Sequence, residues 1–184
     1  GLSMLLNTFH EETQTPVRFE REEIRLDSSR LFEVPFLYLT GHQDFELTAE
    51  ETANVRQYLL RGGLLFAEAC CGRSAFDRSF RYAMEKVLNG RELQRLPATH
   101  PLFMYPNRIT EVQPRTALAR AAGASGKIKP VLYGANVGGH LGVVYSPHGL
   151  ACGWELAECP YCRGIDSADA LRLGVNILTY ALLQ

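Results

Sequence analysis

Short, continuously apolar runs alternate with amphipathic stretches along the chain, and this alternation predicts its elements. Residues 35–40 and 64–67 are too short for helices and have no polar face, which is typical of strands buried on both faces of a parallel sheet. An amphipathic helix follows each run. The first begins at a capping box formed by Thr48 and Glu51, and the second ends at Asn89 and Gly90. This order predicts parallel strands joined by right-handed crossovers.

The remaining patterns predict strands nearer the sheet edges. Residues 17–26 alternate apolar and charged side chains, which indicates a half-exposed edge strand. Residues 93–97 form a second candidate edge strand. Residues 131–136 and 140–145 flank a pair of glycines, so they predict a β-hairpin.

Helical spacing recurs at both ends of the sequence. Residues 3–14 predict a short first helix, and a last helix begins near Asp166. The last helix is expected to bury the apolar residues Leu171, Val175, Leu178 and Leu182. Residues 99–126 are rich in proline, arginine and alanine, and we expect a long loop or insertion over one edge.

Length, composition and charge limit the class of protein. A chain of 184 residues with 46% hydrophobic and 21% charged residues predicts one globular domain over residues 1–184. Gly1 before Leu2, Ser3 and Met4 looks like a remnant of cloning, so we expect that a natural N-terminal extension was removed and that this domain is a fragment of a longer protein. The net charge of −1 and the lack of a basic block disfavour nucleic acid as a partner. No apolar run reaches the roughly 18 residues that a transmembrane helix requires.

Reactive side chains follow three of the predicted strands. In an open α/β sheet, ligands bind outside the carboxyl ends of the strands. If these strands are parallel neighbours, one rim collects His42, Glu68, Cys70, Cys71, Ser146 and His148. We expect a small-molecule ligand or a protein partner to bind there. The residues expected to contact it are His42, Glu68, Cys71, Asp77, Ser146 and Glu155.

Residues 149–164 hold three of the five cysteines and the single tryptophan. The two-residue gap between Cys159 and Cys162 lets both thiolates reach one ion, and Cys152 precedes them. These three cysteines are candidate zinc ligands, with Cys70, Cys71, His148 or His42 as the fourth. Two other interpretations stay open: small buried residues that pack well, or a disulfide or redox pair. An odd number of cysteines favours a reducing compartment such as the cytoplasm.

Cys70 is also a candidate nucleophile. It lies at a strand-to-helix turn, where a helix N-terminus lowers the pKa of a thiol. His148 or His42 could serve as the base, and Glu68 could orient the imidazole. The alternative is that small side chains are simply required where the strand meets the helix.

The combined motifs resemble those of the bacterial DUF4159 family, which has no assigned activity. The resemblance covers nearly the whole chain and is carried by residues 38–42, 64–72, 76–80, 144–147, 152–155, 159–162 and 173–181. It implies a class I glutamine amidotransferase-like domain, that is, a flavodoxin-like three-layer α/β/α sandwich with a mostly parallel sheet.

The same resemblance implies that Cys70 takes the nucleophile position of the amidotransferases. Their motif is Gly-x-Cys-x-Gly followed later by His-x-Glu, and here Glu68 replaces the first glycine. His148 is followed by Gly149 and Leu150, so the triad is incomplete. We therefore expect a ligand- or partner-binding domain without glutaminase activity. The alternative is a thiol- or metal-dependent hydrolase that uses Cys70 or Cys71 with His42 or His148.

Overall fold

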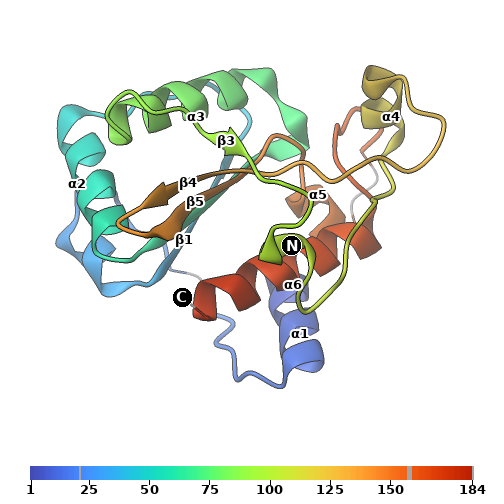
Figure 1. Cartoon of the computed structure of the whole chain (residues 1–184), viewed down its shortest axis with the longest axis horizontal. Coiled ribbons are helices and arrows are strands. Elements are labelled where there is room, and N and C mark those ends of the chain that lie inside the picture. The colour runs from blue at the N-terminus through green and yellow to red at the C-terminus, as the bar shows by residue number, and fades with distance from the viewer. Residues whose placement is uncertain (21, 157–158, 184) are drawn as a thin grey trace.

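The computed structural model describes residues 1–20, 22–156 and 159–183, and these form a mixed α/β fold around one five-stranded sheet (Figure 1). The sheet order is β1-β2-β5-β4-β3. The strands are β1 (Phe36–Gly41), β2 (Leu64–Ala69), β3 (Gln94–Arg95), β4 (Tyr133–Val137) and β5 (His140–Ser146). β1, β2 and β5 are parallel, whereas β4 pairs antiparallel with both β5 and β3. The predicted hairpin and the predicted edge strand within 93–97 are confirmed.

Helices follow the strands in the predicted alternation. In chain order they are α1 (Leu2–Thr13), α2 (Ala49–Leu60), α3 (Ser74–Val87), α4 (Thr116–Ala122), α5 (Ala151–Trp154) and α6 (Ser167–Leu182). The capping box of α2 is present, because the Thr48 hydroxyl accepts a hydrogen bond from the Glu51 N–H and the Glu51 carboxylate accepts one from the Thr48 N–H. No helix of the described residues is long and apolar enough to cross a membrane.

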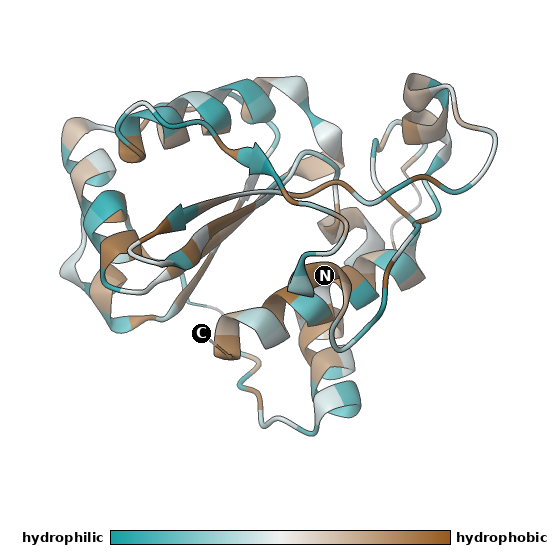
Figure 2. Ribbon diagram, viewed as in Figure 1, coloured by the Kyte–Doolittle hydropathy of each residue, from teal (hydrophilic) through white to brown (hydrophobic). Residues whose placement is uncertain are grey.

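Apolar side chains of β2 alternate between two core clusters on opposite faces of the sheet. Leu64 and Phe66 join the cluster that contains α1 and α6, whereas Leu65 and Ala67 join the cluster that contains α2 and α3. Helices therefore cover both faces (Figure 1). Figure 2 shows that α2 and α3 carry both polar and apolar residues, while the strands beneath them are mainly apolar. The buried character predicted for 64–67 is confirmed.

The strand predicted at 17–26 is wrong for the described residues 17–20 and 22–26, which have no strand structure. The alternation there reflects contact with both core clusters rather than pairing, because Val17 packs on one cluster while Ile24 and Leu26 pack on the other. The prediction for 35–40 is wrong in one respect. The strand exists, but as β1 it lies at the sheet edge, so its apolar side chains are only half-buried.

Two predictions in the second half of the chain also need correction. Residues 99–126 are not one irregular loop, since α4 and a 3-10 turn (Pro101–Phe103) form within them. In α6, Val175 is buried as predicted, whereas Leu182 is 59% exposed at the helix end. The buried stripe of α6 instead includes Leu173 and Ile177, because Trp154 and α1 pack against the middle of the helix.

Candidate functional site

The carboxyl ends of the three parallel strands meet at one rim of the sheet. Thr40 of β1 is in register with Glu68 of β2, and Glu68 is in register with Ser146 of β5. The residues that follow these strands therefore lie side by side, as the sequence predicted.

Three turns of backbone approach one another closely behind this rim. The N–H of Arg163 donates to the carbonyl of Cys71 at 3.0 Å, and residues 149 and 164 form a parallel β-bridge. A Cβ on Gly164 would lie 2.4 Å from the Gly149 carbonyl oxygen, and one on Gly149 would lie 2.7 Å from the Cys71 nitrogen. Only glycine permits this approach, and it brings the turn after β2 against the loop that carries Cys162.

Four cysteines and one histidine gather where these segments meet. The sulfur atoms of Cys71, Cys152 and Cys162 all lie within 4.8 Å of one another, and the Sγ atoms of Cys71 and Cys152 are 3.3 Å apart. In a second group, a ring nitrogen of His42 and the sulfur atoms of Cys70 and Cys71 lie within 4.8 Å of one another. Cys71 belongs to both groups. We call the two groups together the thiol cluster, which consists of His42, Cys70, Cys71, Cys152 and Cys162.

The thiol cluster differs from the predicted ligand set in one residue. Cys152 and Cys162 are in it, but Cys159 belongs to neither group of the described residues, and Cys71 lies beside them instead. The sequence offered Cys71 only as one of four choices for the last ligand. Loop spacing favoured Cys159, whereas the contact that selects Cys71 is made across the fold.

The cluster favours one shared negative charge. The thiols of Cys162 and Cys70, and then that of Cys71, lower the pKa of Cys152 far below its ordinary value. The same contact with Cys152 raises the pKa of Cys70 and of Cys162. Burial, followed by Cys152, raises the pKa of Cys71 to about 11. One thiolate surrounded by thiols is an environment that a cation would stabilise, because each bound thiol would also lose its proton.

Glu68 is fully buried and ties the loop to the sheet. Its carboxylate accepts hydrogen bonds from the Tyr38 hydroxyl at 2.6 Å and from the backbone N–H groups of Leu150 and Ala151 at the start of α5. Burial raises its pKa. The expectation that Glu68 orients an imidazole is wrong, because its oxygens face the hydroxyl of Tyr38 and the start of α5.

His148 is held by its backbone rather than by its ring. The Ser146 hydroxyl donates to the His148 carbonyl at 2.7 Å and accepts from the His148 N–H at 3.3 Å. Burial lowers the pKa of His148 to about 4, although Asp77 opposes the shift. His148 is therefore neutral at pH 7, and it is His42 that lies within reach of Cys70.

The last two predicted contact residues, Asp77 and Glu155, belong to neither group of the thiol cluster among the described residues. Asp77 accepts hydrogen bonds from the Tyr145 hydroxyl at 2.8 Å and from Arg81 Nε at 3.0 Å. Arg81 in turn lies over the Tyr133 ring, 4.3 Å from its centroid. Glu155 is exposed at the end of α5.

A cavity of about 530 Å³ opens at the end of β1, next to the thiol cluster. Its lining includes Thr40, Gly41, His42, Asp44 and Phe76. His42 therefore borders both the cavity and the thiols. A compound held in this cavity would be within reach of the His42 ring.

Arg115 supports the site and was not anticipated from the sequence. It precedes α4 in the region that the pattern predicted as a loop. Its guanidinium donates to the Cys152 carbonyl at 3.1 Å and to the Ile165 carbonyl at 3.2 Å, so it joins both ends of the cysteine-containing loop. Nothing in the local sequence distinguishes this arginine from its exposed neighbours.

The fold and the site together define a mixed α/β domain with clustered thiols at the carboxyl rim of its sheet. The chain belongs to the DUF4159 family, since the family model described as Domain of unknown function (DUF4159) matches residues 1–182. A search of the curated proteins found no match to the chain.

Proposed function

We propose that this chain is a ligand-binding domain of flavodoxin-like, amidotransferase-like α/β/α architecture, without glutaminase activity. A zinc ion would hold its cysteine-containing loop to the rim of the sheet. The observation that carries the proposal is the thiol cluster, in which Cys71, Cys152 and Cys162 come from separate segments yet lie within 4.8 Å of one another. The superfamily assignment is supported by helices on both faces of the sheet and by the cysteine turn after β2.

The geometry of the thiols fits zinc. Tetrahedral zinc with Zn–S bonds of about 2.3 Å separates two bound sulfurs by roughly 3.8 Å. The Sγ atoms of Cys71 and Cys152 are 3.3 Å apart, and no two sulfur atoms of the group are more than 4.8 Å apart. The separation that zinc requires lies between these two distances. Cys71, Cys152 and Cys162 would hold the ion, and His42 or Cys70 would supply the fourth ligand. Bound zinc would neutralise the thiolates and fix the loop to the rim.

The cavity at the end of β1 supports the ligand-binding part of the proposal. Its volume of about 530 Å³ lies within the range of small-molecule sites. It combines the apolar ring of Phe76 with the polar groups of Thr40, His42 and Asp44. Because His42 borders both the cavity and the thiols, the affinity for a ligand in the cavity would depend on whether zinc is bound.

Metal content is the test of the zinc staple. Protein purified without chelators is expected to contain one zinc per chain by mass spectrometry. Cys71→Ser should lose most of that zinc. Cys159→Ser is the matched control, because Cys159 lies in the same loop but outside the thiol groups. A metal-free protein whose five thiols all react in the native state would overturn the proposal.

Ligand binding is tested separately at His42. In a fragment screen followed by nuclear magnetic resonance, hits at this site should shift the His42 ring signals and lose affinity in His42→Ala. His10→Ala is the control, since His10 lies on α1 outside this cavity. Equal affinity of all hits for both variants would contradict a site at the end of β1.

The alternative function is a thiol-dependent hydrolase with Cys70 or Cys71 as nucleophile and His42 as base. The group of His42, Cys70 and Cys71 favours it. The raised pKa values of both thiols count against it, because a nucleophile works as the thiolate. Selective alkylation of Cys70 by iodoacetamide near pH 7 would favour the hydrolase, whereas an inert Cys70 would remove it.

A further inference from the structure

Two cysteines of the thiol cluster are in contact although 81 positions separate them in the chain. The Sγ atoms of Cys71 and Cys152 are 3.3 Å apart. A disulfide places its sulfurs about 2.05 Å apart, so this pair would have to close by only about 1.3 Å. Cys159, in contrast, belongs to neither group of the thiol cluster among the described residues. The fold therefore selects a pair for oxidation that differs from the Cys159 and Cys162 pair of the loop.

The backbone of Cys71 is fixed on one side of this contact. Its carbonyl accepts a hydrogen bond from the Arg163 N–H at 3.0 Å, and a Cβ on Gly149 would lie 2.7 Å from its nitrogen. The φ angle of Cys71 is 54°, in the left-handed region that residues other than glycine seldom adopt. Such a conformation persists only where the surrounding structure enforces it. Cys71 is therefore held against the cysteine-containing loop.

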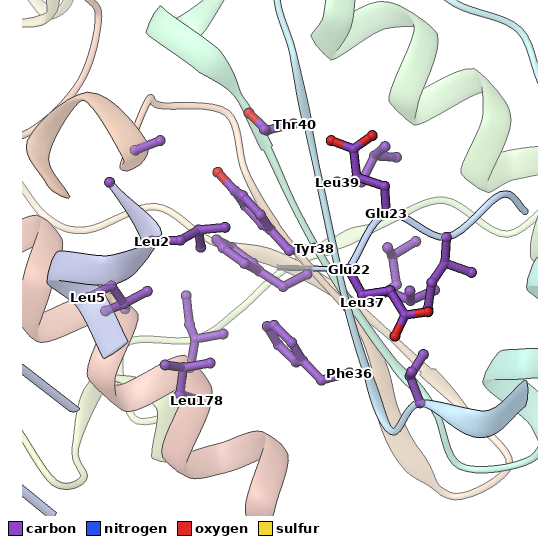
Figure 3. Close-up of a pocket in the computed structure, with 18 of the residues that line it drawn as sticks. Leu2, Leu5, Glu22, Glu23, Phe36, Leu37, Tyr38, Leu39, Thr40 and Leu178 are labelled. Atoms are coloured by element: carbon purple, nitrogen blue, oxygen red, sulfur yellow. The ribbon is translucent and has the colours of Figure 1, made fainter. Parts of the chain in front are cut away.

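The position of Cys152 is fixed on the other side. It lies in α5, and the N–H groups at the start of this helix donate to the buried carboxylate of Glu68. That carboxylate also accepts from the hydroxyls of Tyr38 and Thr40 on β1. Figure 3, a close-up of the cavity beside β1, shows these two side chains on the same side of the strand. The Cys152 carbonyl accepts from the guanidinium of Arg115 at 3.1 Å, so both ends of the sulfur contact are anchored.

The two thiols differ in their access to solvent. Cys71 is partly exposed, whereas Cys152 is only 6% exposed. A reagent from solution therefore reaches Cys71 first. Cys152 lies behind it, at the distance from which it can attack the Cys71 sulfur.

We propose that Cys71 and Cys152 form a redox-modification site that is oxidised by a small disulfide such as oxidised glutathione. The Cys71 thiolate attacks one sulfur of oxidised glutathione, so a mixed disulfide forms, the glutathione S–S bond breaks and one glutathione thiolate leaves. The Cys152 thiolate then attacks the Cys71 sulfur, which forms the Cys71–Cys152 bond and releases the second glutathione. The two cysteines lose two electrons and two protons, and the two glutathione molecules take them up.

Oxidation of this pair would regulate the zinc site, and this consequence rests on the proposed function. Zinc is bound by thiolates, and the new bond would remove two of the three proposed cysteine ligands. Cys162 with His42 or Cys70 would be too few ligands to retain the ion. The bond itself does not require zinc, because the contact between the two sulfurs is a property of the fold.

The experiment compares protein as purified with protein freed of metal by a chelator. Zinc content is measured first, both samples are incubated with oxidised glutathione, and the disulfides are mapped by mass spectrometry after free thiols are alkylated. The Cys71–Cys152 bond is expected in both samples, with release of zinc from the first. In concentrated urea the preference for this pair should disappear, because cysteines close in the sequence, such as Cys159 and Cys162, then meet more often.

Two variants test the order of the steps. Cys152→Ser should accumulate the glutathione adduct on Cys71 and form any disulfide about tenfold more slowly, because the thiol positioned to attack is gone. Cys159→Ser is the matched control and should oxidise at the wild-type rate, since Cys159 lies outside the thiol cluster. Mapping of the wild-type protein keeps the test decisive even if Cys152→Ser does not fold.

Three results would overturn the inference: no disulfide in the zinc-free protein, a different pair formed first, or the same preference for Cys71 and Cys152 in urea. Zinc content separates this inference from the proposed function. Protein that is purified without zinc and still forms the Cys71–Cys152 bond would support the redox site and contradict the zinc site. Protein that forms the bond and retains its zinc would overturn the proposed regulation.

Discussion

Replacing the buried carboxylate of Glu68 by an amide tests how the cysteine loop is held to the sheet. In the native site, one carboxylate accepts from Tyr38 and Thr40 on β1 and from Leu150 and Ala151 at the start of α5. In Glu68→Gln only one oxygen remains, so the amide NH₂ must face either the Tyr38 hydroxyl or the two N–H groups. One donor then faces another donor in a buried position.

The expected cost follows from that mismatch. Leaving a buried donor without its acceptor costs about 1–3 kcal/mol, so we expect Glu68→Gln to lower the free energy of unfolding by about 2 kcal/mol. For a chain of this size, such a loss lowers the melting temperature by about 4–8 °C. If it faced the loop, the amide would oppose two backbone N–H groups whose directions are fixed at the start of α5. The amide is therefore expected to face Tyr38.

A double-mutant cycle in urea checks the orientation. Tyr38→Phe removes the hydroxyl that opposes the amide, so the double variant should be more stable than the sum of the two single losses predicts, by about 1 kcal/mol. Additive losses would refute the proposed contact between the amide and Tyr38. A fully stable Glu68→Gln would refute the view that Glu68 fastens the loop. Zinc content is measured alongside, because a loosened loop should also bind metal less tightly.

Four residues elsewhere give further predictions. The pKa of His148 falls from 6.5 to about 4 on folding, so the unfolded chain binds more protons between these values. Stability should therefore drop by up to about 3 kcal/mol as pH falls from 6.5 to 4, and urea titrations should find this slope missing in His148→Asn. Phe80→Ala should lower the free energy of unfolding by about 3–5 kcal/mol, because Phe80 is fully buried against Tyr145. Leu182→Ala, at the exposed end of α6, should change it by less than about 0.5 kcal/mol. Similar losses for the two variants in calorimetry would contradict the assigned burial. Gly164→Ala should separate the loop from the Gly149 carbonyl and lower zinc content, and unchanged zinc would show that the close approach is not needed.

The order of elements could be predicted from the sequence because it depends on local patterns. The capping box at Thr48 fixes where α2 begins, and the apolar spacing of Phe76, Phe80 and Met84 fixes the buried face of α3. The convergence of three strand ends also followed, since parallel strands joined by crossovers place their carboxyl ends together.

Which residues meet at that rim was decided only by the tertiary structure. Spacing within the loop favoured Cys159, but Gly149 and Gly164 let a distant turn approach and place Cys71 beside Cys152 instead. The role of Glu68 as a buried fastener was hidden for the same reason, because its partners are backbone groups about 80 residues away. The sequence by itself determined the elements and the rim. The close packing of backbone from separate segments determined which thiols form the cluster.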